Sequence, residues 1–187
     1  MPSKQSPPPS KPRAAIALEI GGFKQSKARC GPACLKIVLA YFGKRVSEKA
    51  IARLCRTSVR TGTTGSNLVR GAKRLGLVAT VVDRARFSTI EKWLARGVPV
   101  IVDWMSVLHW QGGRSPMACG HYSVVYAIDK THVHLQDPAI GRERRIARKD
   151  FLNVWFDFKH LFPRKHEDLI IRRLIIAAPP DYFSSPR

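Results

Sequence analysis

The two halves of this chain carry different hydrophobic patterns, and this difference limits the folds open to it. Before about residue 98, most apolar residues recur at helical spacing. After it, short apolar runs alternate with turn residues, which is typical of antiparallel strands. Helices followed by antiparallel strands predict an α+β fold, with a helical lobe, a sheet lobe and a cleft between them.

Boundary signals place the expected elements. The helix signals are a start at Cys30 with a stop at Gly43, a cap at Ser47, a cap at Ser66 with a stop at Gly76, and a capping box at 88–91 with a stop at Gly97. The expected strands are 78–82, 98–103, 121–128, 132–136, 142–146 and 169–177, with a long loop at 105–120 and a short helix from Asp150.

The length of 187 residues suits one domain that buries its core without disulfide support. Residues 1–15 are Pro-rich and predict a linker, residues 16–178 the folded domain, and residues 179–187 a C-terminal tail. No apolar run reaches the about 18 residues of a membrane span. The N-terminus also lacks the apolar core of a secretory signal.

The net charge of +20 is large for this length. Such a charge favours an acidic partner, nucleic acid or an acidic membrane, or it is simply a solvated surface. The basic residues are scattered, and no nucleic-acid-binding motif accompanies them. We therefore expect that nucleic acid is not the direct substrate.

The four cysteines do not form a metal pattern. Cys30 and Cys34 are four residues apart, and no second Cys or His pair completes a zinc site. Cys34 and Cys55 fall among apolar helix positions and are expected to be core thiols. Cys119 has no assigned role. No metal or cofactor is expected.

Cys30 lies where a loop turns into a helix. A thiol at a helix N-terminus feels the positive end of the helix dipole and the unpaired N–H groups of the first turn. Lys27 and Arg29 add positive charge. These features favour the thiolate, which is the reactive form of cysteine.

A nucleophilic cysteine needs a base and a group that orients the base. His121 begins one expected strand and Asp137 ends the strand that returns beside it, so the two are predicted to lie side by side. Taken alone, His121 fits a surface histidine and Asp137 a turn residue; together with Cys30 they favour catalysis. Gln25 could join the Cys30 N–H in stabilising an oxyanion, or be a solvated loop residue.

Several short runs of the chain form a recognisable set. They are Cys30-Gly31-Pro32-Ala33-Cys34-Leu35, Tyr41-Phe42-Gly43, Gly62-Thr63-Thr64, Val98-Pro99-Val100-Ile101, Gly120-His121-Tyr122-Ser123-Val124-Val125 and Asp137-Pro138-Ala139-Ile140-Gly141. In this order they resemble the bacteriocin-processing peptidase family over roughly residues 23–155. Its members are papain-like domains at the front of ABC transporters, and they cut after double-glycine leaders.

The resemblance implies a papain-like cysteine peptidase domain over 16–178, with its active site in the cleft between the helical and sheet lobes. It implies that Cys30 is the nucleophile, His121 the general base and acid, Asp137 the residue that orients His121, and Gln25 the oxyanion-hole residue. The implied substrate is a protein or peptide with a Gly-rich cleavage site. Gln25 departs from the family because it lies five positions before Cys30, where six are expected.

Three other departures are an insertion at 105–118, the high positive charge and the absence of transporter membrane segments. The Pro-rich start, the isolated domain and the charge suggest a bacterial peptidase toxin, made in the cytoplasm and delivered by a contact-dependent system, such as type VI secretion, into a target cell's cytoplasm. An antibacterial effector of this kind implies an immunity protein, which we expect to be acidic. Trp104, Trp110 and the 105–118 loop are candidates for the walls of the cleft, although aromatic residues more often belong to the core or the rim.

Three other functions fit some of these features. A protein deamidase or transglutaminase toxin uses the same Cys, His and Asp for acyl transfer. A non-catalytic peptidase-like module would hold a Gly-rich segment without cutting it. Nucleic-acid binding through charge would weaken steeply with salt and would not depend on Cys30.

Overall fold

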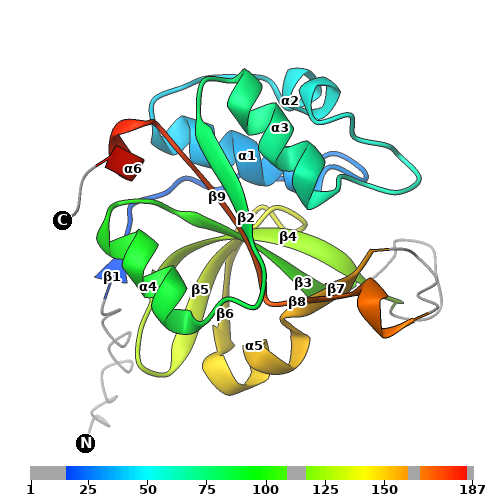
Figure 1. Ribbon diagram of the computed structural model, residues 1–187, viewed down its shortest axis with the longest axis vertical. Coiled ribbons are helices and arrows are strands. Elements are labelled where there is room, and N and C mark those ends of the chain that lie inside the picture. Colours follow the sequence, from blue (N-terminus) through cyan, green and yellow to red (C-terminus); the bar gives the residue numbers. More distant parts are fainter. Residues whose placement is uncertain (1–15, 109–116, 160–164, 185–187) are drawn as a thin grey trace, which may run out of the picture.

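The computed structural model describes residues 16–108, 117–159 and 165–184. The expected linker at 1–15, Trp110 and most of the 105–118 insertion lie outside the described residues. The fold is α+β, as expected (Figure 1). No helix within the described ranges has the length and apolar character needed to span a bilayer.

A single antiparallel sheet forms the centre of the molecule (Figure 1). Its strand order is β2-β9-β3-β4-β5-β6, and the short β1 pairs with β4. The strands are β1 (Ile16–Ala17), β2 (Val78–Val82), β3 (Val100–Leu108), β4 (Met117–Ile128), β5 (His132–Asp137), β6 (Arg142–Ala147) and β9 (Arg173–Ala178). A separate two-stranded sheet joins β7 (Phe156–Phe158) to β8 (Leu169–Ile171), and a 3₁₀ turn covers His166–Asp168.

Helices cover both faces of the central sheet. One face packs against α1 (Cys30–Tyr41), α2 (Glu48–Leu54) and α3 (Gly65–Arg74), which share a core cluster with it. The other face packs against α4 (Phe87–Ala95) and α5 (Arg148–Val154) around a second core cluster. In the C-terminal helix α6 (Asp181–Ser184), Tyr182 contacts Phe42 and Phe183 contacts Trp93, so this short helix packs on the core.

Several boundary predictions are confirmed. Ser47 caps α2, since its Oγ accepts from the Ala50 N–H at 3.2 Å. Gly43, Gly76 and Gly97 follow their helices with φ of 75°, 77° and 76°, the left-handed conformation that ends helices. Cys34 and Cys55 are buried core thiols, as expected.

Other boundaries were wrong. Thr64, not Ser66, caps α3: its Oγ1 accepts from the Asn67 N–H at 3.3 Å. In α4, Thr89 Oγ1 accepts from the Arg86 N–H, so the helix begins at Phe87 and the predicted box at 88–91 lies inside it. In each case the polar side chain that reaches the free N–H sets the helix start.

The strand ends also differ from the prediction. Much of the loop expected at 105–120 is strand, because β3 and β4 continue pairing to Leu108 and Met117. The strand expected at 169–177 breaks into β8 and β9 at Arg172, where φ is 48°. The last predicted helix begins at Arg148 rather than Asp150.

Candidate active site

Cys30 is the first residue of α1, as its place in the sequence predicted. No side chain caps this helix, and no acidic residue lies in its first turn. The sulfur instead accepts hydrogen bonds from the backbone N–H groups of Gly31 and Tyr122. The helix start therefore directs its positive end toward the thiol.

Hydrogen bonds fix the segment before Cys30 to α2 on one side and to the turn after β5 on the other. The Ser26 N–H donates to Glu48 Oε1 at 2.9 Å, and the Glu48 carboxylate also pairs with Arg29 at 3.4 Å. The Gln25 N–H donates to the Pro138 carbonyl at 2.8 Å, which ties this segment to the turn after β5. These contacts fix the approach to α1 relative to both α2 and the sheet.

His121 and Asp137 meet as predicted. His121 Nε2 lies 2.7 Å from Asp137 Oδ1, and both residues are 1% exposed. Their backbone relationship differs from the simple pairing expected. The β4–β5 ladder ends at Val124 opposite Gln136, and the direct cross-strand partner of His121 is Trp104 on β3. The Asp137 side chain reaches His121 from beyond the end of the ladder.

Both carboxylate oxygens of Asp137 accept hydrogen bonds. Its Oδ1 also accepts from the Ala139 N–H at 2.9 Å, and its Oδ2 accepts from Arg144 Nε at 2.8 Å. Burial would raise the pKa of Asp137, but the hydrogen bond and charge of His121, helped by Ala139 and Arg144, lower it. Asp137 is therefore a charged carboxylate whose position is fixed.

Cys30 and His121 favour an ion pair. Burial opposes ionisation of the thiol, yet the hydrogen bond and charge of His121 outweigh it and lower the Cys30 pKa. Burial likewise opposes the charged imidazole, but the bonds to Asp137 and Cys30 raise the His121 pKa to about 9. Since Nε2 is taken by Asp137, the geometry leaves Nδ1 for the sulfur.

The other three thiols differ from Cys30. Burial raises the pKa of Cys34 well above its ordinary value, and burial also raises the pKa of Cys55 to about 11. Burial and the nearby Cys30 raise the pKa of Cys119. Of the four thiols, only Cys30 is in an environment that favours the thiolate.

Trp104, a candidate for the cleft wall, belongs to the core instead, because it is 4% exposed. Its ring packs edge-on against the His121 ring, with centroids 5.9 Å apart, and its Nε1 donates to Ser123 Oγ at 3.1 Å. The guanidinium of Arg144 lies 5.8 Å from the ring centroid. Trp104 thus supports His121 within the sheet.

The sequence reasoning missed a carboxyl pair beside the site, Asp103 and Asp157. Burial raises the pKa of both groups, and the neighbouring Asp157 raises that of Asp103 further, so the pair favours sharing one proton. The Asp157 carboxylate lies over Gly120, next to His121, so a side chain at residue 120 would overlap it. A charged residue in the apolar run 98–103 was the one available signal for this pair.

Gln25 is the fourth predicted site residue. Its backbone is fixed by Pro138, and its Oε1 is buried without a hydrogen-bond partner in the described part of the chain. The oxyanion role of Gln25 stays a prediction.

A thiol at a helix start, facing a buried imidazole and carboxylate on an antiparallel sheet, is the arrangement of papain-like cysteine peptidases. This protein is such a cysteine peptidase. Residues 23–167 match the Peptidase C39 family, and the chain belongs to that family. The family expected from the sequence motifs is thereby confirmed.

Three similar proteins illustrate the relationship. An uncharacterised protein of Methanothermobacter marburgensis is 31% identical over 139 residues, which is 74% of this chain and 84% of that protein. The lactococcin-G-processing and transport ATP-binding protein LagD of Lactococcus lactis is 24% identical over 144 residues, 76% of this chain but 18% of LagD. The solved structure of a double glycine motif protease from an AMS/PCAT transporter, in complex with its leader peptide, gives a TM-score of 0.63 at 21% identity, covering 88% of this chain and 95% of that one.

Proposed function

We propose that this protein is an endopeptidase that cuts peptide substrates at or after a Gly-Gly site. Cys30 is the nucleophile, His121 the general base and acid, and Asp137 the residue that orients His121. Gln25 and the Cys30 N–H stabilise the oxyanion. The observation that carries the proposal is the 2.7 Å contact of His121 with Asp137, beside a thiol whose pKa is lowered.

The first half of the reaction forms an acyl-enzyme. The Cys30 thiolate attacks the scissile carbonyl carbon, and the carbonyl oxygen becomes an oxyanion held by N–H groups at the start of α1. His121 gives its proton to the leaving amine as the C–N bond breaks. The products of this half are a free amine fragment, neutral His121 and a thioester on Cys30.

The second half releases the other fragment. Neutral His121 takes a proton from water, and the resulting hydroxide attacks the thioester carbon. The C–S bond breaks, which frees a carboxylic acid and restores the thiolate and imidazolium. Asp137 keeps its charge throughout, because Arg144 and Ala139 hold it as a carboxylate.

The substrate class rests on the family relationship. LagD is named for processing lactococcin G, and a solved structural neighbour is a double glycine motif protease bound to a leader peptide. These names support a Gly-Gly substrate for this chain. Glycine also suits a narrow cleft, because it has no Cβ to clash with closely packed backbone.

Product analysis tests the proposal. A peptide with a leader segment ending in Gly-Gly is incubated with the wild-type protein or with Cys30→Ala, and the products are weighed by mass spectrometry. We expect two fragments that meet after Gly-Gly with the wild type and an intact peptide with Cys30→Ala. Equal cleavage by both proteins would refute the assignment of Cys30. A chain that stays whole and gains about one dalton would instead indicate a deamidase.

A second candidate role, an antibacterial effector with an acidic immunity protein, is favoured by the net charge of +20. A strongly basic surface attracts an acidic partner and speeds its association. Growth of bacteria that make the wild-type protein in the cytoplasm, compared with bacteria that make Cys30→Ala, tests this role. Equal growth of the two strains would count against a toxin.

A further inference from the structure

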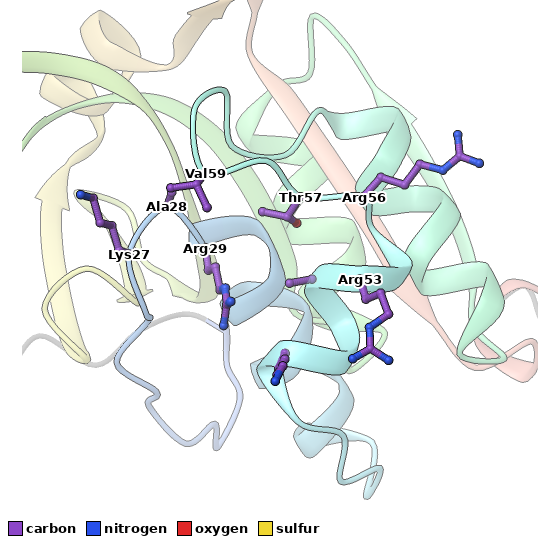
Figure 2. A pocket seen from close by; sticks show the side chains of 9 residues that line it. Lys27, Ala28, Arg29, Arg53, Arg56, Thr57 and Val59 are labelled. Atoms are coloured by element: carbon purple, nitrogen blue, oxygen red, sulfur yellow. The ribbon is translucent and has the colours of Figure 1, made fainter.

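A pocket of about 360 Å³ opens beside the start of α1 (Figure 2). Its walls come from the turn before α1, from α2 and from the loop after α2. The lining residues are Lys27, Ala28, Arg29, Lys49, Ala52, Arg53, Arg56, Thr57 and Val59. The pocket is large enough for one or two side chains and lies outside the Cys30–His121–Asp137 group.

The pocket is strongly cationic. Five of its nine lining residues are Lys or Arg, and none is acidic. Glu48 pairs with Arg29, but Lys49, Arg53 and Arg56 have no acidic partner among the residues that the structure describes. Three exposed residues of the lining therefore carry positive charges that no acidic side chain of the described structure neutralises.

The positive field extends along α3. Burial lowers the pKa of Arg70, and the charges of Arg56 and then Arg74 lower it further. Arg56 and Arg74 therefore repel the positive charge of Arg70. An anion bound near Arg56 would relieve this repulsion.

Two residues of the pocket have a strained backbone. Ala28 has φ of 60° and Arg56 has φ of 48°, a left-handed conformation that costs residues with a side chain about 1 kcal/mol or more. The Arg56 N–H donates to the Arg53 carbonyl at 3.1 Å, which holds the turn after α2. Such a conformation persists only where the surrounding structure holds it, as the turn at the end of α2 does for Arg56.

The pocket lies close to the catalytic thiol. Arg29 directly precedes Cys30. On the other wall, Thr57 Oγ1 lies 2.7 Å from Thr63 Oγ1, and the Thr63 side chain packs against Gly31, the residue after Cys30. The axes of two packed helices, such as α1 and α2, lie about 8–10 Å apart. We take this spacing as the distance from the Cys30 sulfur to the pocket. A substrate in extended form covers that distance in about three residues.

We propose that this cationic pocket binds acidic side chains of the peptide substrate, about three residues from the scissile bond. The inference rests on the proposed peptidase function and adds a substrate preference to it. Carboxylates of Asp or Glu match the guanidinium groups of Arg53 and Arg56. Because these pairs are partly exposed, we expect an advantage of about tenfold in kcat/KM at low ionic strength, decreasing with salt.

The test compares peptides that contain Gly-Gly and carry either two glutamates or two glutamines, moved stepwise along both sides of the cleavage site. The pocket variant is Lys49→Gln/Arg53→Gln/Arg56→Gln. The matched control, Lys92→Gln/Lys130→Gln/Lys149→Gln, removes the same charge from exposed lysines on α4, the β4–β5 turn and α5. The glutamate-to-glutamine ratio of kcat/KM is measured for each protein, with thermal melts to confirm folding.

We expect one placement of glutamates with a ratio of about ten in the wild type and the control, and a ratio near one in the pocket variant. An unchanged ratio in the pocket variant, or an equal loss in the control, would overturn the inference. If the wild type cleaves no peptide, the peptidase proposal fails, but the proposed preference for acidic residues can still be tested. Fluorescence anisotropy of the labelled peptides on Cys30→Ala then still measures whether the pocket selects acidic residues.

Discussion

His121 Nε2 lies 2.7 Å from Asp137 Oδ1, and this contact joins two strands at a point where their backbone ladder has already ended. Arg144 and the Ala139 N–H hold the carboxylate from its other sides. The imidazole is therefore fixed in orientation by a group that is itself immobilised. This fixed pair gives the Cys30 sulfur a proton donor and acceptor of defined position.

Asp137→Asn is expected to lower kcat/KM at least tenfold, less than the loss in Cys30→Ala or His121→Ala. The amide keeps the shape of the side chain but removes the charge that favours the imidazolium and fixes its tautomer. Steady-state kinetics on one cleaved peptide measures the effect. Activity equal to that of the wild type would show that Asp137 does not orient the base.

The pH dependence of kcat/KM is expected to be bell-shaped. The rising limb follows ionisation of Cys30, whose pKa is lowered. The falling limb lies near pH 9, because His121 there loses the proton that it gives to the leaving amine. In Asp137→Asn the falling limb should move to lower pH, because Asp137 helps to raise the His121 pKa. Profiles of both proteins from about pH 5 to about pH 10 check this; a falling limb at the same pH in both would argue against the pairing.

Gly120→Ala is expected to destabilise the fold by about 1–3 kcal/mol. The added Cβ would overlap the Asp157 carboxylate, which accepts from the Phe158 N–H at 2.7 Å and interacts with Asp103, so it cannot move without losing these contacts. Urea denaturation measures the change. Gly21→Ala is the matched control, since a Cβ there meets no atom within 4 Å of the described structure; equal stability of both variants would contradict the packing.

Gly71→Ala is expected to destabilise the protein even though alanine favours helices over glycine by about 1 kcal/mol. The new Cβ would overlap the sulfur of Cys55, the C-cap residue of α2, where α3 packs against it. Removing that sulfur in Cys55→Ala/Gly71→Ala should recover part of the loss. A double-mutant cycle by urea denaturation measures the coupling, and strictly additive effects would show that the two side chains do not meet.

The predictions that succeeded from sequence rest on local rules. Cys30 before Pro32, Ser47 before its helix and Gly43 after its helix act through neighbouring backbone groups, so their positions alone determine the result. The hairpin length predicted the contact of His121 with Asp137, although their side chains meet beyond the end of the backbone ladder rather than as a cross-strand pair. Each of these signals needs only a short stretch of chain.

The features that were missed depend on residues far apart in the sequence. Asp103 meets Asp157 through the packing of a separate small sheet on β3 and β4, and Trp104 lies under His121 because β3 and β4 pair beyond the expected loop. The cationic pocket joins residues before α1 to residues after α2. Hydrophobic patterns do not specify such long-range pairings, so the structure was needed to find them.

Alkylation of Cys30 tests the central claim most directly. The protein is treated with limiting iodoacetamide near pH 7, the labelled cysteines are identified by mass spectrometry, and residual peptidase activity is measured on the same samples. We predict that Cys30 is labelled first, because its pKa is lowered while those of Cys34, Cys55 and Cys119 are raised, and that activity falls in proportion to its labelling. Full activity after complete modification of Cys30 would contradict the account.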